Sequence, residues 1–311
     1  MIAILGAGGS IANHLVPLLA SGPEPMRLVS RSARPDSRAA EVLAADLTVP
    51  EQAAQAVAGC RTAFLLAGLK YDHKVWAEAW PRIMGNVIEG CKRAGARLVF
   101  FDNVYMYGRV QGAMTEATPF QPVSKKGEVR ARIAAWLMRE WEAGALTAMI
   151  ARSADFYGPA TPTAIPSAMV FAPLSRGKKA SWLVNDEVPH SFTYTPDAAR
   201  ALAALAARDS AWNQTWHLPT APQPPTGSEF IEMAAAALHA APRYRVLSPG
   251  MVRSFGWFRP VIGEVYEMLY QNDAPYIFDS SKYAAAFGFA GTGYREGIRA
   301  TAAPLRAAKA A

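Results

Sequence analysis

The 311-residue sequence predicts an α/β fold built around a doubly wound parallel sheet, with a smaller mixed α/β region toward the C-terminal end. Short apolar runs without polar alternation, typical of parallel strands covered on both faces, alternate with helical patterns up to about residue 152. A glycine-rich turn directly follows the first of these runs. A hydrophobic fraction of 51% supplies enough apolar side chains for a sizeable core.

The first predicted strand, residues 1–5, runs into a glycine-rich turn and a helix. The turn and the first helical residues are Gly6, Gly8, Gly9, Ser10 and Ile11. Glycine lets the backbone turn tightly and approach a ligand, and the first amides of a helix lie unpaired at its positive end. A second apolar strand at residues 26–30 completes a βαβ unit. The stretch predicts a Rossmann-type site for the pyrophosphate of a dinucleotide, and a purely structural turn is the alternative.

The remaining elements follow in order along the chain. Further strands are predicted at residues 42–46, 62–67, 96–101 and 146–152, with helices at residues 52–58, 75–94 and 128–141. Proline then becomes frequent, and a strand and helix at 193–205 precede helical patches at 230–239, 251–270 and 283–287. We expect a dinucleotide-binding domain over residues 1–158, completed by about 192–218, and a substrate-binding region over residues 159–191 and 219–311.

The end of the second strand bears on the choice of cofactor. An NAD-preferring site would carry Asp or Glu here, and a carboxylate would repel the 2′-phosphate of NADP. This chain has Ser30 and Arg31 instead, with Arg34 close behind. Because a guanidinium pairs with phosphate through two parallel hydrogen bonds, Arg31 and Arg34 favour NADP. Solvent-facing arginines in a loop are the alternative.

Two later strand ends are also expected to contact the cofactor. Asp46 and Leu47 follow the third strand, where they could meet the adenine. Ala67 and Gly68 follow the fourth strand, where small residues would leave room for the nicotinamide ribose. Packing would explain the two small residues equally well.

Four segments in the right order resemble the extended short-chain dehydrogenase/reductase family, also called the NAD-dependent epimerase/dehydratase family. They are the GxxGxxG-like turn Gly6–Ala12, the VYG-like segment Val104–Gly108, the RxxxxYGP-like loop Arg152–Pro159 and the strand-to-helix segment Pro189–Asp197. The resemblance covers nearly the whole chain and implies a Rossmann fold with a nicotinamide cofactor. It also implies a homodimer paired through the helices that flank Lys126.

The same resemblance places altered residues at the catalytic positions. Family enzymes use a tyrosine as acid or base, a lysine four residues later and an upstream serine or threonine. Residues 122–130, PVSKKGEVR, are similar to the family's PxSxYGxSK, which puts Lys126 at the tyrosine and Arg130 at the lysine. Asn103 takes the upstream serine position, and Trp80 that of a helix asparagine. The chain therefore resembles atypical members with an altered catalytic tetrad.

Several side chains could replace the missing acid or base. Lys126 and Arg130 lie one helical turn apart, so the guanidinium would favour a neutral Lys126 amine that exchanges a proton. Alternatively, both side chains bind the nicotinamide ribose or an anionic group. Tyr105, two residues past Asn103 in a segment expected to be extended, is the first choice for a displaced proton donor, and Tyr71 is the second. Each tyrosine could instead be an aromatic wall.

The substrate is expected to meet residues on the C-terminal side. Asp155 and Tyr157 lie in the RxxxxYGP-like loop, and His190 precedes a later strand. His190 is also a third choice for the proton donor, with a structural histidine as the alternative. Aromatic residues such as Trp182 and Phe192 indicate either core packing or an apolar pocket, and a pocket would favour a hydrophobic substrate.

Charge and cysteine usage exclude several classes of partner. The formal charge of +7 arises from scattered basic residues without interleaved aromatics, so no nucleic acid is expected. Cys60 and Cys91 have no metal-ligand spacing, and we expect no metal. No run reaches the ~18 apolar residues of a membrane span. A strand beginning at Met1 leaves no room for a signal peptide, so we expect a cytoplasmic protein that binds no membrane.

The leading hypothesis from the sequence is an NADPH-dependent oxidoreductase. It would transfer a hydride to or from a small, mostly apolar carbonyl or activated-alkene substrate, with a non-standard proton donor. One alternative is a non-catalytic NADP(H)-binding protein that senses redox state. Another is a nucleotide-sugar epimerase or dehydratase, which is disfavoured because those reactions depend on the missing tyrosine.

Overall fold

The computed structural model describes residues 1–32 and 34–310, which form two compact units. The first unit consists of Met1–Gly108, Phe120–Arg152 and Ala198–Trp216. The second consists of Arg109–Pro119, Ser153–Asp197 and the chain from His217 onward. The chain leaves the first unit after Arg152, earlier than the expected position 158, because the next strand pairs within the second unit.

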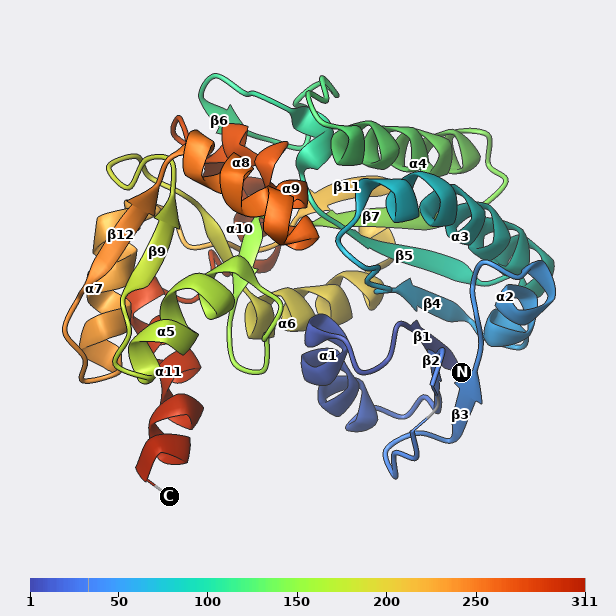
Figure 1. Ribbon diagram of the computed structural model, residues 1–311. Helices are drawn as coiled ribbons and strands as arrows, with labels where there is room; N and C mark the ends of the chain where they lie inside the picture. Colours follow the sequence, from blue (N-terminus) through green and yellow to red (C-terminus); the bar gives the residue numbers. More distant parts are fainter. Residues whose placement is uncertain (33, 311) are drawn as a thin grey trace. The chain divides into compact units, whose positions relative to one another are not determined.

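The first unit is built on a seven-stranded sheet, which confirms the predicted doubly wound α/β fold (Figure 1). The strand order is β11-β7-β5-β4-β1-β2-β3, and every pairing from β3 through to β7 is parallel. The strands are β1 (Ile2–Leu5), β2 (Met26–Ser30), β3 (Glu41–Ala44), β4 (Thr62–Leu65), β5 (Arg97–Asp102), β7 (Ala148–Arg152) and β11 (Gln214–His217). Strands β1, β4 and β7 are buried along their whole length, as expected for a sheet covered on both faces.

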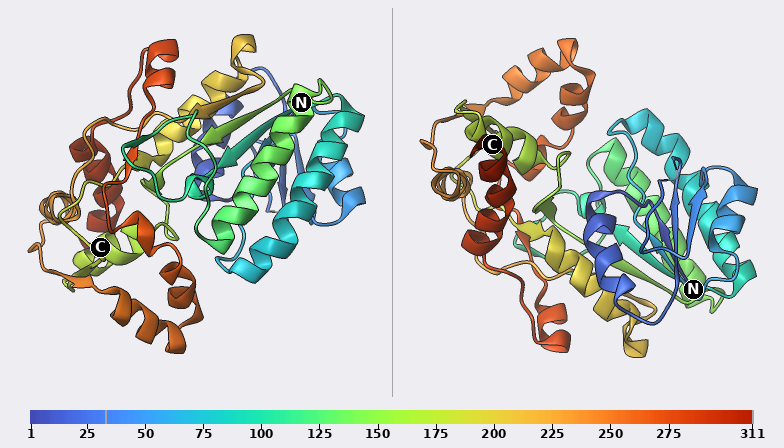
Figure 2. Two further views of the ribbon diagram at one scale, coloured as in Figure 1. Left: turned by 90° about the horizontal axis from the view of Figure 1, so that it is seen from above. Right: turned by 90° about the horizontal axis from the view of Figure 1, so that it is seen from below.

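Helices cover both faces of this sheet. Helices α2 (Pro50–Val57), α3 (His73–Ala94) and α4 (Lys125–Glu142) lie side by side on one face, and α1 (Ser10–Ala20) and α6 (Thr195–Ala206) lie on the other (Figures 1 and 2). Helix α4 begins earlier than predicted because Ser124 caps it, its hydroxyl accepting a hydrogen bond from the Gly127 amide at 3.0 Å. Gly95, with φ +64°, ends α3.

The second unit contains three two-stranded parallel pairs. They are β8–β10, β9–β12 and β6–β13, formed by β6 (Ala113–Met114), β8 (Asp155–Tyr157), β9 (Ala180–Leu183), β10 (Phe192–Tyr194), β12 (Tyr244–Leu247) and β13 (Ile277–Phe278). Its helices are α5 (Ala172–Ser175), α7 (Gly227–Ala237), α8 (Pro249–Phe258), α9 (Pro260–Tyr266), α10 (Ser281–Phe287) and α11 (Tyr294–Ala310). The helical patch predicted at 251–270 is confirmed as helical and is divided into α8 and α9, because Pro260 starts a new helix after Arg259.

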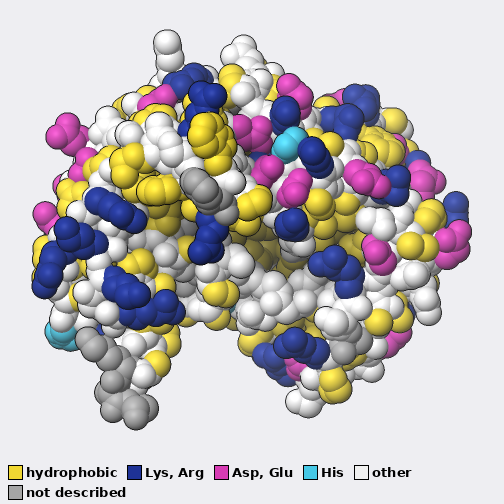
Figure 3. All heavy atoms as spheres, in the orientation of Figure 1, with side chains coloured by type: hydrophobic (Ala, Val, Ile, Leu, Met, Phe, Trp, Pro, Cys, Tyr) yellow, Lys and Arg dark blue, Asp and Glu magenta, His cyan; other side chains and the backbone are white. Residues whose placement is uncertain are grey.

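The sequence led us to expect that the chain binds neither nucleic acid nor a membrane, and the surface and the helices bear on these two expectations. On the face drawn in Figure 3, lysine and arginine side chains stand in small groups among acidic and apolar side chains. Among the described residues, no helix is both long enough and apolar enough to span a bilayer.

Candidate functional site

The glycine-rich turn is shaped by its contact with the end of β4. Gly6 has φ +109°, and a Cβ built on it would lie 2.6 Å from the Ala67 amide nitrogen. The amides of Gly6 and Ala7 both donate to the Val29 carbonyl of β2, at 2.9 and 3.0 Å. The turn thus passes between β2 and β4 at a distance that only glycine permits at position 6.

The turn presents the beginning of α1 as an anion site. Gly9 is the extended N-cap residue of α1, it offers no capping side chain, and the first turn holds no acidic residue. Gly8, with φ +84°, is exposed, and a Cβ on it would meet nothing within 4 Å. Ser10 begins the helix, while Ile11 is buried in the core. These residues fit a pyrophosphate, which the α1 dipole and its unpaired amides would hold.

The other expected cofactor residues follow the carboxyl ends of strands β2, β3 and β4. Arg31 and Arg34 are both exposed after β2. After β3, Asp46 accepts hydrogen bonds from the amide and hydroxyl of Thr48, at 2.9 and 2.7 Å. The two Thr48 bonds lower the pKa of Asp46, and the charge of Arg31 adds to this shift. The Asp46 carboxylate therefore has firm partners within its own loop.

The residues that follow β3 and β4 were also expected to contact the cofactor. Leu47 is buried, and its carbonyl accepts a hydrogen bond at 3.0 Å from the side chain of Asn86 on α3. Sequence reasoning missed Asn86, and nothing in its helical surroundings marks it as a partner of this loop. After β4, Ala67 is half-buried, and a Cβ on the exposed Gly68 would meet nothing within 4 Å. Space beside Gly68 fits the expected ribose contact.

The Asn103 segment differs from the predicted extended strand. Asn103 Oδ1 accepts a hydrogen bond from the Tyr105 amide at 3.1 Å, and residues Tyr105–Tyr107 form a 3₁₀ turn. The two side chains therefore do not follow the alternation of an extended strand, and that prediction is wrong. The Tyr105 ring is buried and stacks on Trp76, with centroids 6.2 Å apart and planes at 13°. Tyr105 is thus part of an aromatic wall.

Lys126 lies in the first turn of α4, against that wall. Its side chain is completely buried, and its ammonium lies 4.5 Å from the centroid of the Tyr71 ring. The Tyr71 ring in turn packs edge-on against Trp76, at 5.8 Å. Lys126, Tyr71, Trp76 and Tyr105 form what we call the Lys126 cluster. A cation over an aromatic face is stabilised electrostatically, so the cluster suits a charged ammonium.

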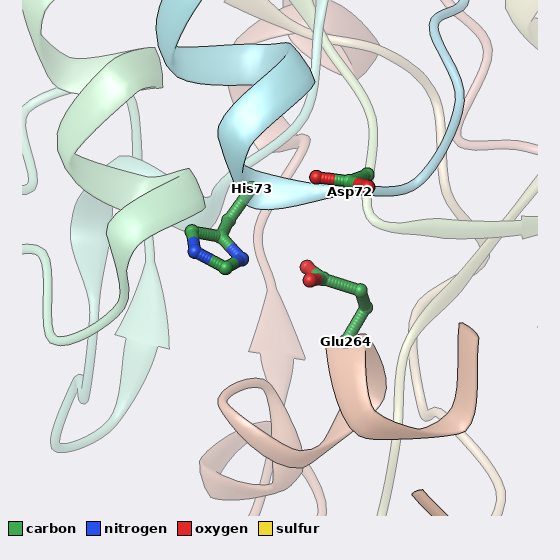
Figure 4. Close-up of side chains that lie close together, drawn as sticks. All are labelled: Asp72, His73 and Glu264. Carbon is green, nitrogen blue, oxygen red and sulfur yellow. The ribbon is translucent and has the colours of Figure 1, made fainter. Parts of the chain in front are cut away.

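The turn that carries Tyr71 is fixed by the cap of α3. Asp72 Oδ1 accepts hydrogen bonds from the amides of Lys74 and Val75, at 2.9 and 3.3 Å, which lower its pKa. Figure 4 shows Asp72 and His73 where α3 begins. Glu264, also labelled there, belongs to α9 of the second unit.

Arg130 points into the interior, in contrast to the prediction that it binds the cofactor ribose. Its guanidinium lies 4.0 Å from the ring centroid of Trp80 and 4.7 Å from that of Trp76. Its Nη1 donates to Asp102 Oδ1 at 3.2 Å, and 8% of the side chain is exposed. Burial lowers the pKa of Arg130, and the Asp102 carboxylate opposes that shift. The Arg130 guanidinium is thus engaged by an ion pair and by aromatic faces within the first unit.

Asp102, the last residue of β5, lies between two buried arginines. Its Oδ2 is 3.8 Å from Nε of Arg152, whose Nη1 donates to the Tyr107 hydroxyl at 2.7 Å. Burial raises the pKa of Asp102, and the guanidinium groups of Arg130 and Arg152 counteract it. Sequence reasoning missed this network. Two features of the sequence could have indicated it. Asp102 is a charged residue at the end of an apolar strand, and Trp80 falls where the family resemblance would place an asparagine.

Two of the three expected substrate residues meet in the second unit. His190 Nε2 lies 3.1 Å from Asp155 Oδ2, and both residues line one cavity. The buried His190 ring stacks on Tyr276, with centroids 4.3 Å apart, and also contacts the tilted ring of Phe192 at 4.6 Å. Such packing fixes the imidazole and leaves the carboxylate of Asp155 as the more exposed member of the pair.

Tyr157, the third expected substrate residue, belongs to the core of the second unit. It is 1% exposed, and its ring stacks on Tyr294 at 6.0 Å. A Cβ on Gly297 would lie 2.3 Å from the Tyr157 hydroxyl, so the ring is closed in on that side. Burial raises the pKa of Tyr157 far above its usual range. Its position corrects the expectation, because the side chain packs in the core and does not line the cavity.

Comparisons with known proteins complete the description. A sequence model of the NAD dependent epimerase/dehydratase family matches residues 2–217. No curated protein matches the sequence. Among similar solved structures, MoeE5 in complex with UDP-glucuronic acid and NAD is 22% identical (TM-score 0.79), and the UDP-glucose 4-epimerase of Thermus thermophilus in complex with NAD is 18% identical (TM-score 0.79). UDP-glucose 4-epimerase from Thermotoga maritima with UDP-glucose is 17% identical (TM-score 0.81). Each match covers 99% of both chains.

Proposed function

The chain belongs to the NAD dependent epimerase/dehydratase family, and from this membership we propose that it is an NADP(H)-dependent oxidoreductase. Its substrate would be a small, mostly apolar carbonyl compound or activated alkene. The observation that carries the proposal is the buried ammonium of Lys126 over the Tyr71 ring, in the segment that resembles the family's tyrosine motif.

The choice of NADP over NAD rests on the end of β2. Arg31 and Arg34 offer exposed guanidinium groups where a carboxylate would select NAD. Gly8 and Gly9 leave the start of α1 open to the pyrophosphate. When bound, NADP(H) would supply or accept the hydride.

Lys126 would act on the substrate oxygen. The Tyr71 ring stabilises its ammonium, and an ammonium can donate a hydrogen bond or a proton to an oxygen that gains negative charge. The Arg130 guanidinium is already paired with Asp102 and lies over the Trp80 ring, so we expect it to stay with these partners and not to compete for that oxygen. Lys126 therefore replaces Tyr105 as our first candidate for the proton donor.

The decisive experiment compares wild type with Lys126→Met. Stopped-flow absorbance at the nicotinamide band would follow NADPH oxidation across a panel of ketones, aldehydes and enones. We expect Lys126→Met to bind NADPH normally but to transfer hydride at least ~100-fold more slowly, the usual effect of losing a general acid. Lys125→Met, which changes the exposed neighbour, is the matched control and should retain full activity.

Two outcomes would replace this proposal. NADPH binding without oxidation by any substrate would support the non-catalytic redox-sensing alternative. The same protein preparation would also be incubated with UDP-glucose and the products analysed. An epimerised or dehydrated product would support a nucleotide-sugar epimerase or dehydratase. We include the UDP-glucose assay because UDP-glucose 4-epimerases are among the proteins of similar fold.

A further inference from the structure

Helices α8 and α9 form a hairpin, which lies at the periphery of the second unit in both views of Figure 2. Gly256 and Gly263 lie where the two helices cross, and a Cβ built on Gly256 would lie 2.8 Å from the Gly263 Cα. The crossing requires glycine, because a side chain at position 256 would push the helices apart. We call residues 249–266 the α8–α9 hairpin.

One side of the α8–α9 hairpin packs against its own unit. Val252 of α8 is 1% exposed and belongs to a small apolar cluster with Leu183 at the end of β9 and Leu247 at the end of β12. Ile262 and Val265 of α9 pack against the same cluster. These contacts anchor the hairpin, while most of its other side chains are exposed.

The exposed part of the α8–α9 hairpin is rich in large apolar side chains. Nine large apolar side chains are exposed among the residues that the structure describes, and five of them belong to this hairpin: Met251, Phe255, Trp257, Val261 and Tyr266. Trp257 is 79% exposed, more than any of the other eight. A single exposed apolar residue is ordinary, but five on two short helices indicate an interaction surface.

The charges of the hairpin indicate which surface it fits. Arg253 and Arg259 are exposed, and residues 249–263 contain no acidic residue. Arg243 and Arg245, just before and within the strand that leads to α8, are exposed as well. A symmetric contact between two such hairpins would bring like charges together, whereas an anionic surface complements them.

We propose that the α8–α9 hairpin docks the chain on the surface of a membrane that contains anionic lipids. The Trp257 ring and its apolar neighbours would enter the boundary between headgroups and acyl chains, and Arg253 and Arg259 would contact lipid phosphates. Docking of this kind does not need a helix that spans the bilayer. The proposal therefore replaces the expectation from the sequence that the chain binds no membrane, and it is independent of the proposed oxidoreductase activity.

Co-sedimentation of the full chain with lipid vesicles tests this proposal. The probes are vesicles of phosphatidylcholine alone and vesicles in which part of the phosphatidylcholine is replaced by phosphatidylserine. We expect the chain to partition at least ~10-fold more strongly to the phosphatidylserine vesicles, and added salt should reduce this preference. Equal partition to the two kinds of vesicle, or binding to neither, would overturn the proposal.

Substitutions of the exposed apolar residues assign the binding to the hairpin. Trp257→Ser should weaken partition to the phosphatidylserine vesicles at least ~10-fold, because a large apolar side chain no longer leaves water. Leu18→Ser is the matched control at an exposed apolar position of α1 and should leave partition unchanged. Both side chains are exposed, and circular dichroism would verify that both variants fold.

Substitutions of arginine test the preference for anionic lipid. Arg253→Gln/Arg259→Gln should lower the ratio of phosphatidylserine to phosphatidylcholine partition at least ~10-fold. Arg295→Gln/Arg299→Gln removes two exposed arginines of α11 in the same unit and should leave that ratio largely unchanged. An equal loss in the two double variants would mean that net charge alone attracts the chain, and the hairpin would be excluded.

Fluorescence and sedimentation identify the surface that is in contact. Brominated phosphatidylcholine quenches a tryptophan that enters the acyl region, so binding should quench Trp257→Phe, which keeps an apolar ring, less than wild type. Equal quenching of the two proteins would place another surface on the membrane and overturn the proposal. A dimer seen by sedimentation velocity without vesicles, and dissociated by Trp257→Ser, would instead make the hairpin a contact between copies of the chain and would also overturn it.

Discussion

Replacing Asp102 with asparagine should strongly destabilise the first unit. Asp102 is fully buried and lies beside Arg130 and Arg152, whose side chains are 8% and 1% exposed. An amide keeps the shape and can still accept the hydrogen bond from the Asn103 amide, but it removes the charge and turns an NH₂ group toward Arg152. It leaves two buried guanidinium groups without a counter-charge, which typically costs about 3–5 kcal/mol. That is a large share of the roughly 5–15 kcal/mol that stabilises a folded protein.

Urea denaturation followed by tryptophan fluorescence would measure this loss. With m-values of about 1–3 kcal/mol per molar, a loss of about 3–5 kcal/mol should lower the midpoint by roughly 1–5 M. Asp209→Asn is the matched control, because Asp209 pairs with Arg97 at 3.0 Å but is 95% exposed, and its midpoint should barely move. The double variant Asp102→Asn/Arg130→Met should recover part of the loss by removing one uncompensated cation. An Asp102→Asn midpoint equal to that of wild type would refute the reasoning.

Three other predictions concern the nucleotide site. Gly6→Ala should abolish NADP binding or folding, because its Cβ would meet the Ala67 backbone. Gly8→Ala should fold and only weaken NADP binding. Circular dichroism would measure folding of the two variants, and calorimetry would measure their NADP binding. Arg31→Asp should lower the NADP-to-NAD affinity ratio at least ~10-fold, and an unchanged ratio would remove Arg31 from the site. Thr48→Val should raise the pKa of Asp46 in an NMR titration, since one of two Thr48 hydrogen bonds is lost. Because the pKa of Asp46 is depressed in the folded state, its carboxylate stabilises the fold at neutral pH, and this stabilisation is lost as the pH falls through the folded-state pKa. The stability difference between Thr48→Val and wild type should therefore shrink at low pH.

The sequence predicted the strand, turn and helix at the start of the chain well because this segment is local. Five consecutive positions, from Gly6 to Ser10, specify a strand end, a turn and a helix start, and each conformation follows from neighbours in the chain. Strands β1 to β5 and β7 of the central sheet were also found, since burial on both faces leaves a continuous apolar run, whereas β11 was missed. The strand pairs of the second unit were missed because they are two to four residues long and pair with distant segments.

The orientation of side chains in the altered tetrad could not be predicted. Helical spacing places Lys126 and Arg130 on one face, but it does not say which partners each will find. Asp102 draws Arg130 inward, and Tyr71 receives the ammonium of Lys126, two contacts that join residues 28 and 55 positions apart. Tertiary contacts of this kind decide the conformation of long charged side chains, whereas helix periodicity decides only their starting direction.

The altered catalytic positions depend on one another physically. Arg130 can lie in the interior because Asp102 supplies a counter-charge and the Trp80 ring lies 4.0 Å from its guanidinium. An asparagine in place of Trp80 would present a polar amide to that guanidinium and leave a smaller side chain in a fully buried position. A lysine at position 130 would lose the planar guanidinium that stacks on Trp80 while pairing with Asp102. With Arg130 held by Asp102 and Trp80, our proposal leaves Lys126 as the cation for the substrate, and we expect that restoring the residue of the family pattern at one of these positions alone would not restore the pattern of contacts.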